Sequence, residues 1–205
     1  MRFTYSVVAA DSNSWPDASK GVAMTGGSLA EVGARLWGLW SPVFGLPMNT
    51  AVAIHLITTN ETEAPTGMVE RSLTEADGVS EARTRLFVPT SRPTSKAGPD
   101  RAGIYVHRWM RFRSIDVEEA VALSTEAWSG FESAWDAEIQ GLFRETPDDR
   151  GETQLLLLTW YRDLATWQAS RRPTGDSTWE NFLRRHALTL ASEAHCTELV
   201  KLPNP

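Results

Sequence analysis

An internal repeat is the sequence feature that most constrains the fold of this 205-residue chain. The residues Gly-Leu-Trp at 38–40 return as Gly-Leu-Phe at 141–143, and Thr50 returns as Thr153, both 103 residues later. In each copy a turn follows the glycine triplet, and the threonine opens an apolar run. Each half is about as long as a minimal domain. We therefore expect two copies of one structural unit, which would settle the architecture before any single residue is interpreted.

Composition excludes several classes of partner. The chain is 41% hydrophobic and 22% charged, which is ordinary for a globular protein. Its net charge of −6 argues against nucleic acid or an anionic membrane as the main partner. Cys196 is the single cysteine, so an internal disulfide is excluded and a reducing, cytoplasmic location is expected. No apolar run approaches the ~18 residues that a membrane-spanning helix needs.

The second half shows a β-α-β-β-α-β pattern, which is typical of a ferredoxin-like unit. Alternation and capping residues place its elements. The expected strands are Gly103–Arg113, Glu138–Arg144, Thr153–Tyr161 and Cys196–Leu202. A first helix is expected to begin at Ser114 and Asp116, and a turn is expected at 147–151. Further helical regions are expected to begin at Asp163 and Asp176, with a break between them at 173–175.

The first half follows the same order less clearly. Its expected elements are the strand Arg2–Ala10, an irregular loop Asp11–Gly27, a short helix Ser28–Leu36, the hairpin Gly38–Phe44 and Thr50–Thr59, a polar loop Asn60–Gly67, a helix Val69–Ala76 and the strand Glu81–Val88. We therefore predict a degenerate first repeat at 1–90, a Pro-containing linker at 91–102 and a second repeat at 103–205.

Two segments of the second half resemble a known family. Ile-Gln-Gly-Leu-Phe at 139–143, a polar turn, and Leu-Leu-Leu-Leu-Thr-Trp-Tyr-Arg-Asp-Leu at 155–164 resemble the NIPSNAP-like branch of the dimeric α/β-barrel superfamily. The resemblance covers about Gly103–Leu202. The family often carries a histidine two residues before the tryptophan, where this chain has Leu158. With the repeat offset of 103 residues, His55 in the first copy corresponds to Leu158 in the second. The first copy would therefore hold the histidine that the family carries.

The resemblance implies a barrel with an internal pocket. A four-stranded antiparallel sheet with helices on one face must cover its other face. In this superfamily two such sheets close on each other around an apolar cavity. The predicted class is therefore α+β, with two tandem ferredoxin-like repeats whose sheets pair face to face into an α/β barrel. We also expect a homodimer, because the apolar strands leave surface to cover.

The alternation of side chains along each strand then separates the residues that face the helices from those that face the barrel interior. It places Val52, Ile54 and Leu56 on the helix side, which leaves His55 and Ile57 toward the barrel. On the first strand of the second half, Arg108 falls on the apolar side without an explanation. The predicted catalytic residues are His107, His55 and Tyr105, and the predicted substrate-binding residues are Trp109, Arg111, Trp160, Leu158, Ile57, Trp40 and Phe143.

Some of these residues also have a purely structural interpretation. His107 could be a strand histidine that hydrogen-bonds across the sheet, and Arg111 could be a solvated charge at the barrel mouth. His186 lies on a predicted helix, where some barrel relatives bind haem, but a lone helix histidine beside Arg184 and Arg185 is more often a surface residue. The spacing of His, Cys, Asp and Glu predicts no metal site, and no cofactor is expected.

Three functions from different classes fit the sequence. The first is a small-molecule enzyme with an aromatic-lined pocket, acting on a hydrophobic or polycyclic substrate. The resemblance implies cofactor-independent cyclisation, isomerisation, elimination or oxygenation, through acid–base groups. The second is a haem-binding barrel protein. The third is a non-catalytic NIPSNAP-like interaction module, expected where side chains fill the cavity.

Overall fold

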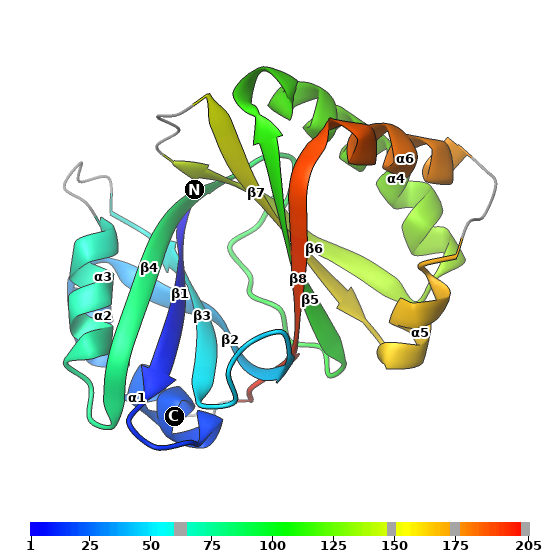
Figure 1. Ribbon diagram of the computed structural model, residues 1–205. Coiled ribbons are helices and arrows are strands. Elements are labelled where there is room, and N and C mark those ends of the chain that lie inside the picture. The colour runs from blue at the N-terminus through cyan, green and yellow to red at the C-terminus, as the bar shows by residue number, and fades with distance from the viewer. Residues whose placement is uncertain (60–64, 147–150, 173–176, 202–205) are drawn as a thin grey trace. The chain divides into compact units, whose positions relative to one another are not determined.

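The computed structural model describes residues 1–59, 65–146, 151–172 and 177–201 and divides the chain into two compact units. The first unit comprises Met1–Val88, Ser95–Arg101 and the chain from His195, and the second comprises Pro89–Thr94 and Ala102–Ala194. Eight strands and six α-helices lie in the described residues (Figure 1). The predicted α+β, ferredoxin-like class is confirmed, and neighbouring strands such as β1 and β3 or β5 and β7 pair antiparallel.

The first unit builds one sheet with its helices on one face. Its elements are β1 (Arg2–Ala10), α1 (Trp15–Met24), α2 (Gly26–Glu31), β2 (Ala34–Phe44), β3 (Thr50–Ile57), α3 (Pro65–Thr74), β4 (Val79–Pro89) and the C-terminal part of β8 (Thr189–Leu199). The strand order within this unit is β4-β1-β3-β2-β8. Strand β3 lies at the centre and is buried along its whole length.

Helix α1 occupies most of the segment in which the sequence predicted an irregular loop at Asp11–Gly27. Pro16 is in the first turn, where its missing N–H costs nothing. Ala18 and Val22 are buried in the core cluster, together with Leu73 of α3 and Ala53 of β3. The loop prediction was wrong because these buried residues are few and small, so the helical period was obscured by the surrounding Ser and Gly.

The second unit repeats this arrangement. Its elements are β5 (Ile104–Arg113), a 3₁₀ turn (Ser114–Asp116), α4 (Val117–Ala134), β6 (Ala137–Thr146), β7 (Glu152–Tyr161), α5 (Leu164–Ala169), α6 (Ser177–Leu188) and the N-terminal part of β8. The strand order is β8-β5-β7-β6. Asp163 caps α5 as predicted, because its carboxylate accepts a hydrogen bond from the Thr166 N–H at 2.7 Å. The predicted turn at 147–151 and break at 173–175 fall largely outside the described residues.

The repeated glycines have the same role in both units. A Cβ on Gly38 would collide with the Trp40 ring, and a Cβ on Gly141 would collide with the Phe143 ring. In each copy the aromatic ring two residues later therefore lies over the glycine. This shared arrangement is the physical reason for the repeated triplet.

The next strands, however, align with an offset one residue longer. Gly38 pairs with Ile54, whereas Gly141 pairs with Leu158, and these two partners are 104 residues apart. His55 is therefore equivalent to Thr159, not to Leu158. A shift of one residue moves a side chain to the other face of a sheet, so this difference reverses the predicted orientation of the first copy.

The boundaries between the units also differ from the predicted linker. Ser95–Arg101 belongs to the first unit, where the Trp37 indole N–H donates to the Ala97 carbonyl at 2.8 Å. Thr90 instead hydrogen-bonds Leu142 of the second unit. The C-terminal part of β8 pairs with β2, so the predicted last strand of the second repeat completes the first. The face-to-face pairing of the two sheets stays a prediction.

Candidate active site in the second unit

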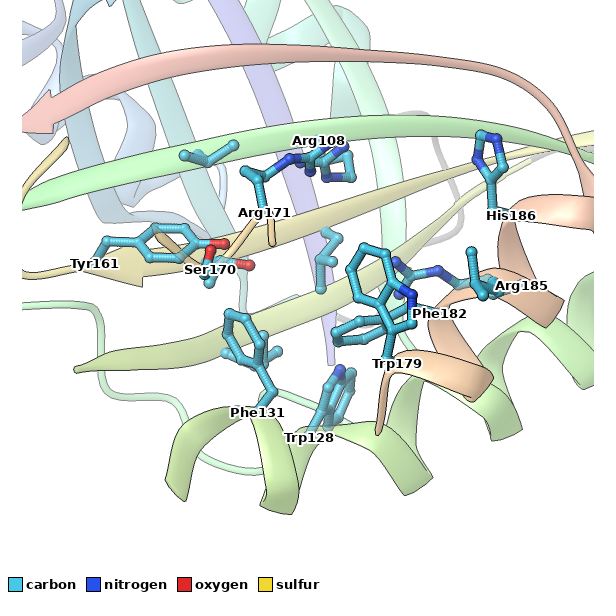
Figure 2. A pocket seen from close by; sticks show the side chains of 15 residues that line it. Arg108, Trp128, Phe131, Tyr161, Ser170, Arg171, Trp179, Phe182, Arg185 and His186 are labelled. Atoms are coloured by element: carbon cyan, nitrogen blue, oxygen red, sulfur yellow. The ribbon is translucent and has the colours of Figure 1, made fainter. Parts of the chain in front are cut away.

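A pocket of about 280 Å³ lies within the second unit, between the helix-covered face of the sheet and helices α4 and α6. Figure 2 shows Trp128 and Phe131 rising from α4, with Trp179 and Phe182 on α6. These four rings form the helical wall of the pocket. The arrangement is typical of small-molecule sites, in which aromatic surface surrounds a few polar groups.

The opposite wall comes from alternate residues of three strands. Val106 and Arg108 of β5, Ile139 of β6, and Thr159 and Tyr161 of β7 all line the pocket. Because successive strand side chains point to opposite faces, these residues share the face that the helices cover. Arg108, which the sequence left unexplained, therefore has a place in the wall of a pocket.

Tyr161 contributes a buried phenolic hydroxyl to the site. It is 6% exposed and hydrogen-bonds Ser170, whose hydroxyl in turn donates to the Trp167 carbonyl at 2.8 Å. Burial raises the pKa of Tyr161 above its usual value, and the nearby charge of Arg108 partly opposes this shift. Tyr161 therefore keeps its proton at neutral pH and is a hydrogen-bond donor rather than a base.

Three guanidinium groups give the pocket a positive charge. Burial, and then the charge of Arg171, lowers the pKa of Arg108. Burial, and then the charge of Arg108, lowers the pKa of Arg185 to about 10. The Arg185 guanidinium donates to the Ser124 hydroxyl at 3.1 Å and lies 5.0 Å from the centroid of the Phe182 ring. Arg108 and Arg185 nevertheless remain charged at neutral pH.

None of these arginines forms a salt bridge with a carboxylate in the described part of the chain. Other arginines of the same unit do: Arg184 pairs with Glu119 at 3.4 Å, and Arg111 pairs with Glu152 at 3.3 Å. Besides burial, the groups that shift the pKa of Arg108 are instead Arg171, which lowers it, and Tyr161, which raises it. The pocket is therefore a local excess of positive charge in a protein of net negative charge.

Trp128 adds a buried donor to the pocket wall. The residue is 2% exposed, and its indole Nε1 has no hydrogen-bond partner among the described residues. An unpaired buried N–H costs free energy, which an acceptor on a bound molecule would recover. His186, in contrast, is exposed and lies at the rim.

Most of the predicted site residues of the second half lie on the other face of this sheet. Tyr105, His107 and Trp109 alternate with Val106 and Arg108, and all three are buried. Leu158, Trp160 and Phe143 share that opposite face through their strand pairings. Their catalytic and substrate-binding roles stay predictions. Arg111 is exposed and paired with Glu152, which agrees with the solvated alternative.

The predicted orientation of the first copy was wrong. Ala51, Ala53 and Ile57 pack in the core cluster beneath α1, α2 and α3, and His55 shares their alternation. His55 and Ile57 therefore face the helices, whereas Trp40 pairs with Val52 on the opposite face. Burial lowers the pKa of His55 to about 4, so its imidazole is neutral at pH 7.

Of the site residues that the sequence suggested, only the haem-ligand candidate His186 lines the pocket, and the other lining residues were missed. One signal was present: Arg108 interrupts an otherwise apolar strand face, and a charge at such a position requires either a partner or a cavity. The contributions of Arg185, Ser170 and Tyr161 had no such signal, since they depend on how the helices after β7 fold back onto the sheet.

Solved structures show what this chain is similar to. No protein-family model and no curated protein matches the sequence. An anthrone oxidase-like protein aligns with a TM-score of 0.61 at 9% identity, covering 98% of this chain and 91% of that one. A ferredoxin-fold protein of Listeria monocytogenes, related to antibiotic biosynthesis monooxygenases, aligns with a TM-score of 0.52 at 7% identity, covering 98% and 96%.

A haem-binding protein of Thermus thermophilus aligns with a TM-score of 0.54 at 11% identity, covering 98% of this chain and 91% of that one. At such identities these likenesses establish the ferredoxin fold and no more. The NIPSNAP branch stays a prediction.

Two further findings concern the described residues alone. They contain no group of three or more metal-ligating side chains. They also contain no helix that is long and apolar enough to cross a membrane.

Proposed function

We propose that this protein is a small-molecule enzyme whose active site is the pocket between α4, α6 and the sheet of the second unit. The observation that carries the proposal is a buried hydroxyl, Tyr161, next to Arg108 in an aromatic-lined cavity. Burying a charge and a hydroxyl in such a place costs free energy, which a functional role would explain. The fold shared with an anthrone oxidase-like protein supports this class of function.

The substrate is a hydrophobic, ring-containing molecule, and the chemistry is acid–base chemistry without a bound cofactor. Rings of the substrate would lie among Trp128, Phe131, Trp179 and Phe182. The Tyr161 hydroxyl, which donates to Ser170 in the ligand-free protein, would turn its proton toward a substrate oxygen when the substrate binds. Arg108 would stabilise the enolate or phenolate that remains when the substrate passes a proton to water, since Tyr161 keeps its own proton. Cyclisation, isomerisation, elimination and oxygenation by dioxygen all begin from such an anion.

The test compares the two faces of one sheet. Purified protein is incubated with a panel of polycyclic phenols and enolisable ring ketones, under air and under argon, and products are followed by mass spectrometry. We expect Tyr161→Phe to lower the rate by on the order of 10²–10⁴, as loss of an acid–base group does. The matched control, Tyr105→Phe, removes a hydroxyl from the other face and should retain the rate.

If Tyr105→Phe and His107→Ala lose activity while Tyr161→Phe stays fully active, the active site lies on the opposite face of the sheet of the second unit. The predicted homodimer and cytoplasmic location are independent of this result and stay predictions.

Haem binding is the second candidate. His186 lines the pocket and could supply a nitrogen ligand, and the guanidinium groups would suit the carboxylates of the porphyrin, although a cavity of about 280 Å³ would enclose only part of the porphyrin ring. Bound haem would supply oxidation chemistry that these side chains lack. Titration with haem should then give a Soret band that His186→Ala shifts or abolishes, whereas an unchanged spectrum in that variant excludes His186 as the ligand.

A further inference from the structure

We propose that this pocket selects an anionic aromatic ligand, with its rings among the aromatic side chains and its carboxylate or phosphate group held by Arg108 and Arg185. The inference rests on the proposed function and names the substrate class of that same site. Three features of the described residues carry it: uncompensated positive charge, an anchored guanidinium group and a buried unpaired donor.

The first feature is the uncompensated charge. Arg108, Arg171 and Arg185 line one pocket, and no carboxylate forms a salt bridge with them in the described ranges. Figure 2 shows Arg108 and Arg171 next to each other at the sheet side of the pocket. Like charges in a partly buried site repel each other, and the repulsion is strengthened by the low dielectric of the surroundings. A bound anion would turn this repulsion into attraction.

The second feature is the anchoring of Arg185. Its guanidinium donates to the Ser124 hydroxyl at 3.1 Å and lies over the Phe182 ring at 5.0 Å. These contacts fix the plane of the group and use few of its five N–H donors. A fixed planar fork binds two oxygens of a carboxylate or a phosphate side by side. Arg185 is therefore arranged to recognise an oxyanion.

The third feature is the Trp128 indole, which offers a hydrogen-bond donor to a second polar group of the ligand. Its buried Nε1–H lacks a partner among the described residues and belongs to the aromatic wall on α4. A carbonyl or hydroxyl oxygen of the ligand would accept this hydrogen bond. The ligand that fits carries an anion toward the arginines and an acceptor toward Trp128.

The volume limits the size of the ligand. At about 280 Å³ the pocket is near the lower end of small-molecule sites, which begin at roughly 300 Å³. A molecule of about two fused rings with one acidic group matches this space. The probes below therefore share one two-ring skeleton and differ only in the attached group.

The experiment measures binding by isothermal titration calorimetry on the full chain. The probes are 1-naphthoate, 1-naphthyl phosphate and the neutral 1-naphthalenemethanol. We expect at least one anionic probe to bind 10-fold or more tightly than the neutral one, and the order of the two anions tells a carboxylate site from a phosphate site. Arg108→Gln and Arg185→Gln should each remove that preference. Arg184→Gln is the matched control, because Arg184 lies on the same helix but pairs with Glu119.

Three results would overturn the inference. They are equal affinity for the neutral and anionic probes, no binding of either anion, or a loss in Arg184→Gln as large as in Arg108→Gln. Circular dichroism of each variant ensures that a loss of binding is not a loss of folding. The proposed function fails separately: Arg108-dependent binding of an anion, combined with full turnover in Tyr161→Phe, supports the anion site and refutes the assigned catalytic residue.

Discussion

Ser6 of β1 and Arg108 of β5 hold equivalent positions in the two repeats. Ser6 pairs with Ala53, and Arg108 pairs with Leu157. Ala53 and Leu157 are themselves equivalent, because each pairs with the leucine that follows the repeated glycine. Leu39 of β2 pairs with Ala53, and Leu142 of β6 pairs with Leu157. The hydroxyl of Ser6 lies 3.0 Å from that of Thr84, within the sheet. One position thus holds a small, satisfied hydroxyl in the first unit and a cation in the second.

This is one of several differences between the helix faces of the two units. In the first, small residues such as Ala18 and Ala53 allow α1 to pack closely on the sheet. In the second, the large rings of Trp128 and Phe182 and the long side chain of Arg108 surround a cavity. In the described residues, one copy therefore has a core cluster of mostly small side chains on its helix face, and the other has the pocket.

Replacing Arg108 with Leu should stabilise the ligand-free protein or leave its stability unchanged. The substitution removes a partly buried charge and its repulsion with Arg171 and Arg185, and apolar replacement of buried charges is often neutral or stabilising by about 1–4 kcal/mol. Chemical denaturation at pH 7 measures the change in the free energy of unfolding. A destabilised variant would indicate that Arg108 has a stabilising partner.

Arg184→Leu is the comparison for this measurement. Arg184 is exposed and paired with Glu119, so its removal should change the free energy of unfolding by less than about 1 kcal/mol. If Arg108→Leu gains stability but loses the binding of anionic probes, the charge is retained for binding rather than for folding.

Gly141→Ala should destabilise the second unit by about 1–3 kcal/mol, because the added methyl group collides with the Phe143 ring in a packed layer. Gly27→Ala is the matched control, since no atom lies within 4 Å of its added Cβ on helix α2. Alanine at that helical position should be neutral or slightly stabilising. Thermal unfolding of the two variants separates the effects, and equal stabilities would contradict the ring-over-glycine arrangement.

The repeat and the alternation of the second half were sufficient to predict the fold class and the faces of β5. Seven of the ten residues of that strand are buried, but its polar side chains differ between the two faces, so the alternation is visible. Strand β3 offered no such contrast, because all eight of its residues are buried. Its faces depend on a one-residue difference in register, which the hydrophobic pattern cannot reveal.

The pocket could be predicted only in part. Aromatic content indicated an apolar small-molecule site, and Tyr105 and His107 were chosen because enclosed polar groups suggest function. The described pocket instead uses Arg108 and Tyr161 on the other face of the sheet. Its helical wall is assembled from α4 and α6, which are separated by β6, β7 and α5 in the sequence. Local periodicity carries no information about such a tertiary contact.

His55 should make the stability of the first unit depend on pH. Its pKa is about 4 in the folded chain and 6.5 in the unfolded one, because burial disfavours the charged imidazole. The stabilisation by neutral His55 is therefore complete above pH 6.5 and is lost as the pH falls toward 4. At about 1.4 kcal/mol per pKa unit the loss is on the order of 3 kcal/mol.

The measurement is denaturant unfolding between pH 4 and pH 8, with His55→Leu as the comparison. Leucine removes the titrating group and should flatten the profile over this range. A wild-type profile as flat as that of the variant would show that the imidazole is accessible to solvent.

Cys196 should be unreactive toward thiol reagents until β8 separates from β2. The thiol is buried and its residue pairs with Phe44, and burial, followed by the charge of Glu198, raises its pKa to about 11. The reactive thiolate is therefore scarce at pH 8. As the only cysteine, it makes the signal of a chromogenic disulfide reagent specific to this strand. We expect slow modification in buffer and rapid modification in 6 M guanidinium chloride, whereas equal rates would show that the C-terminal part of β8 is not held in the sheet of the first unit.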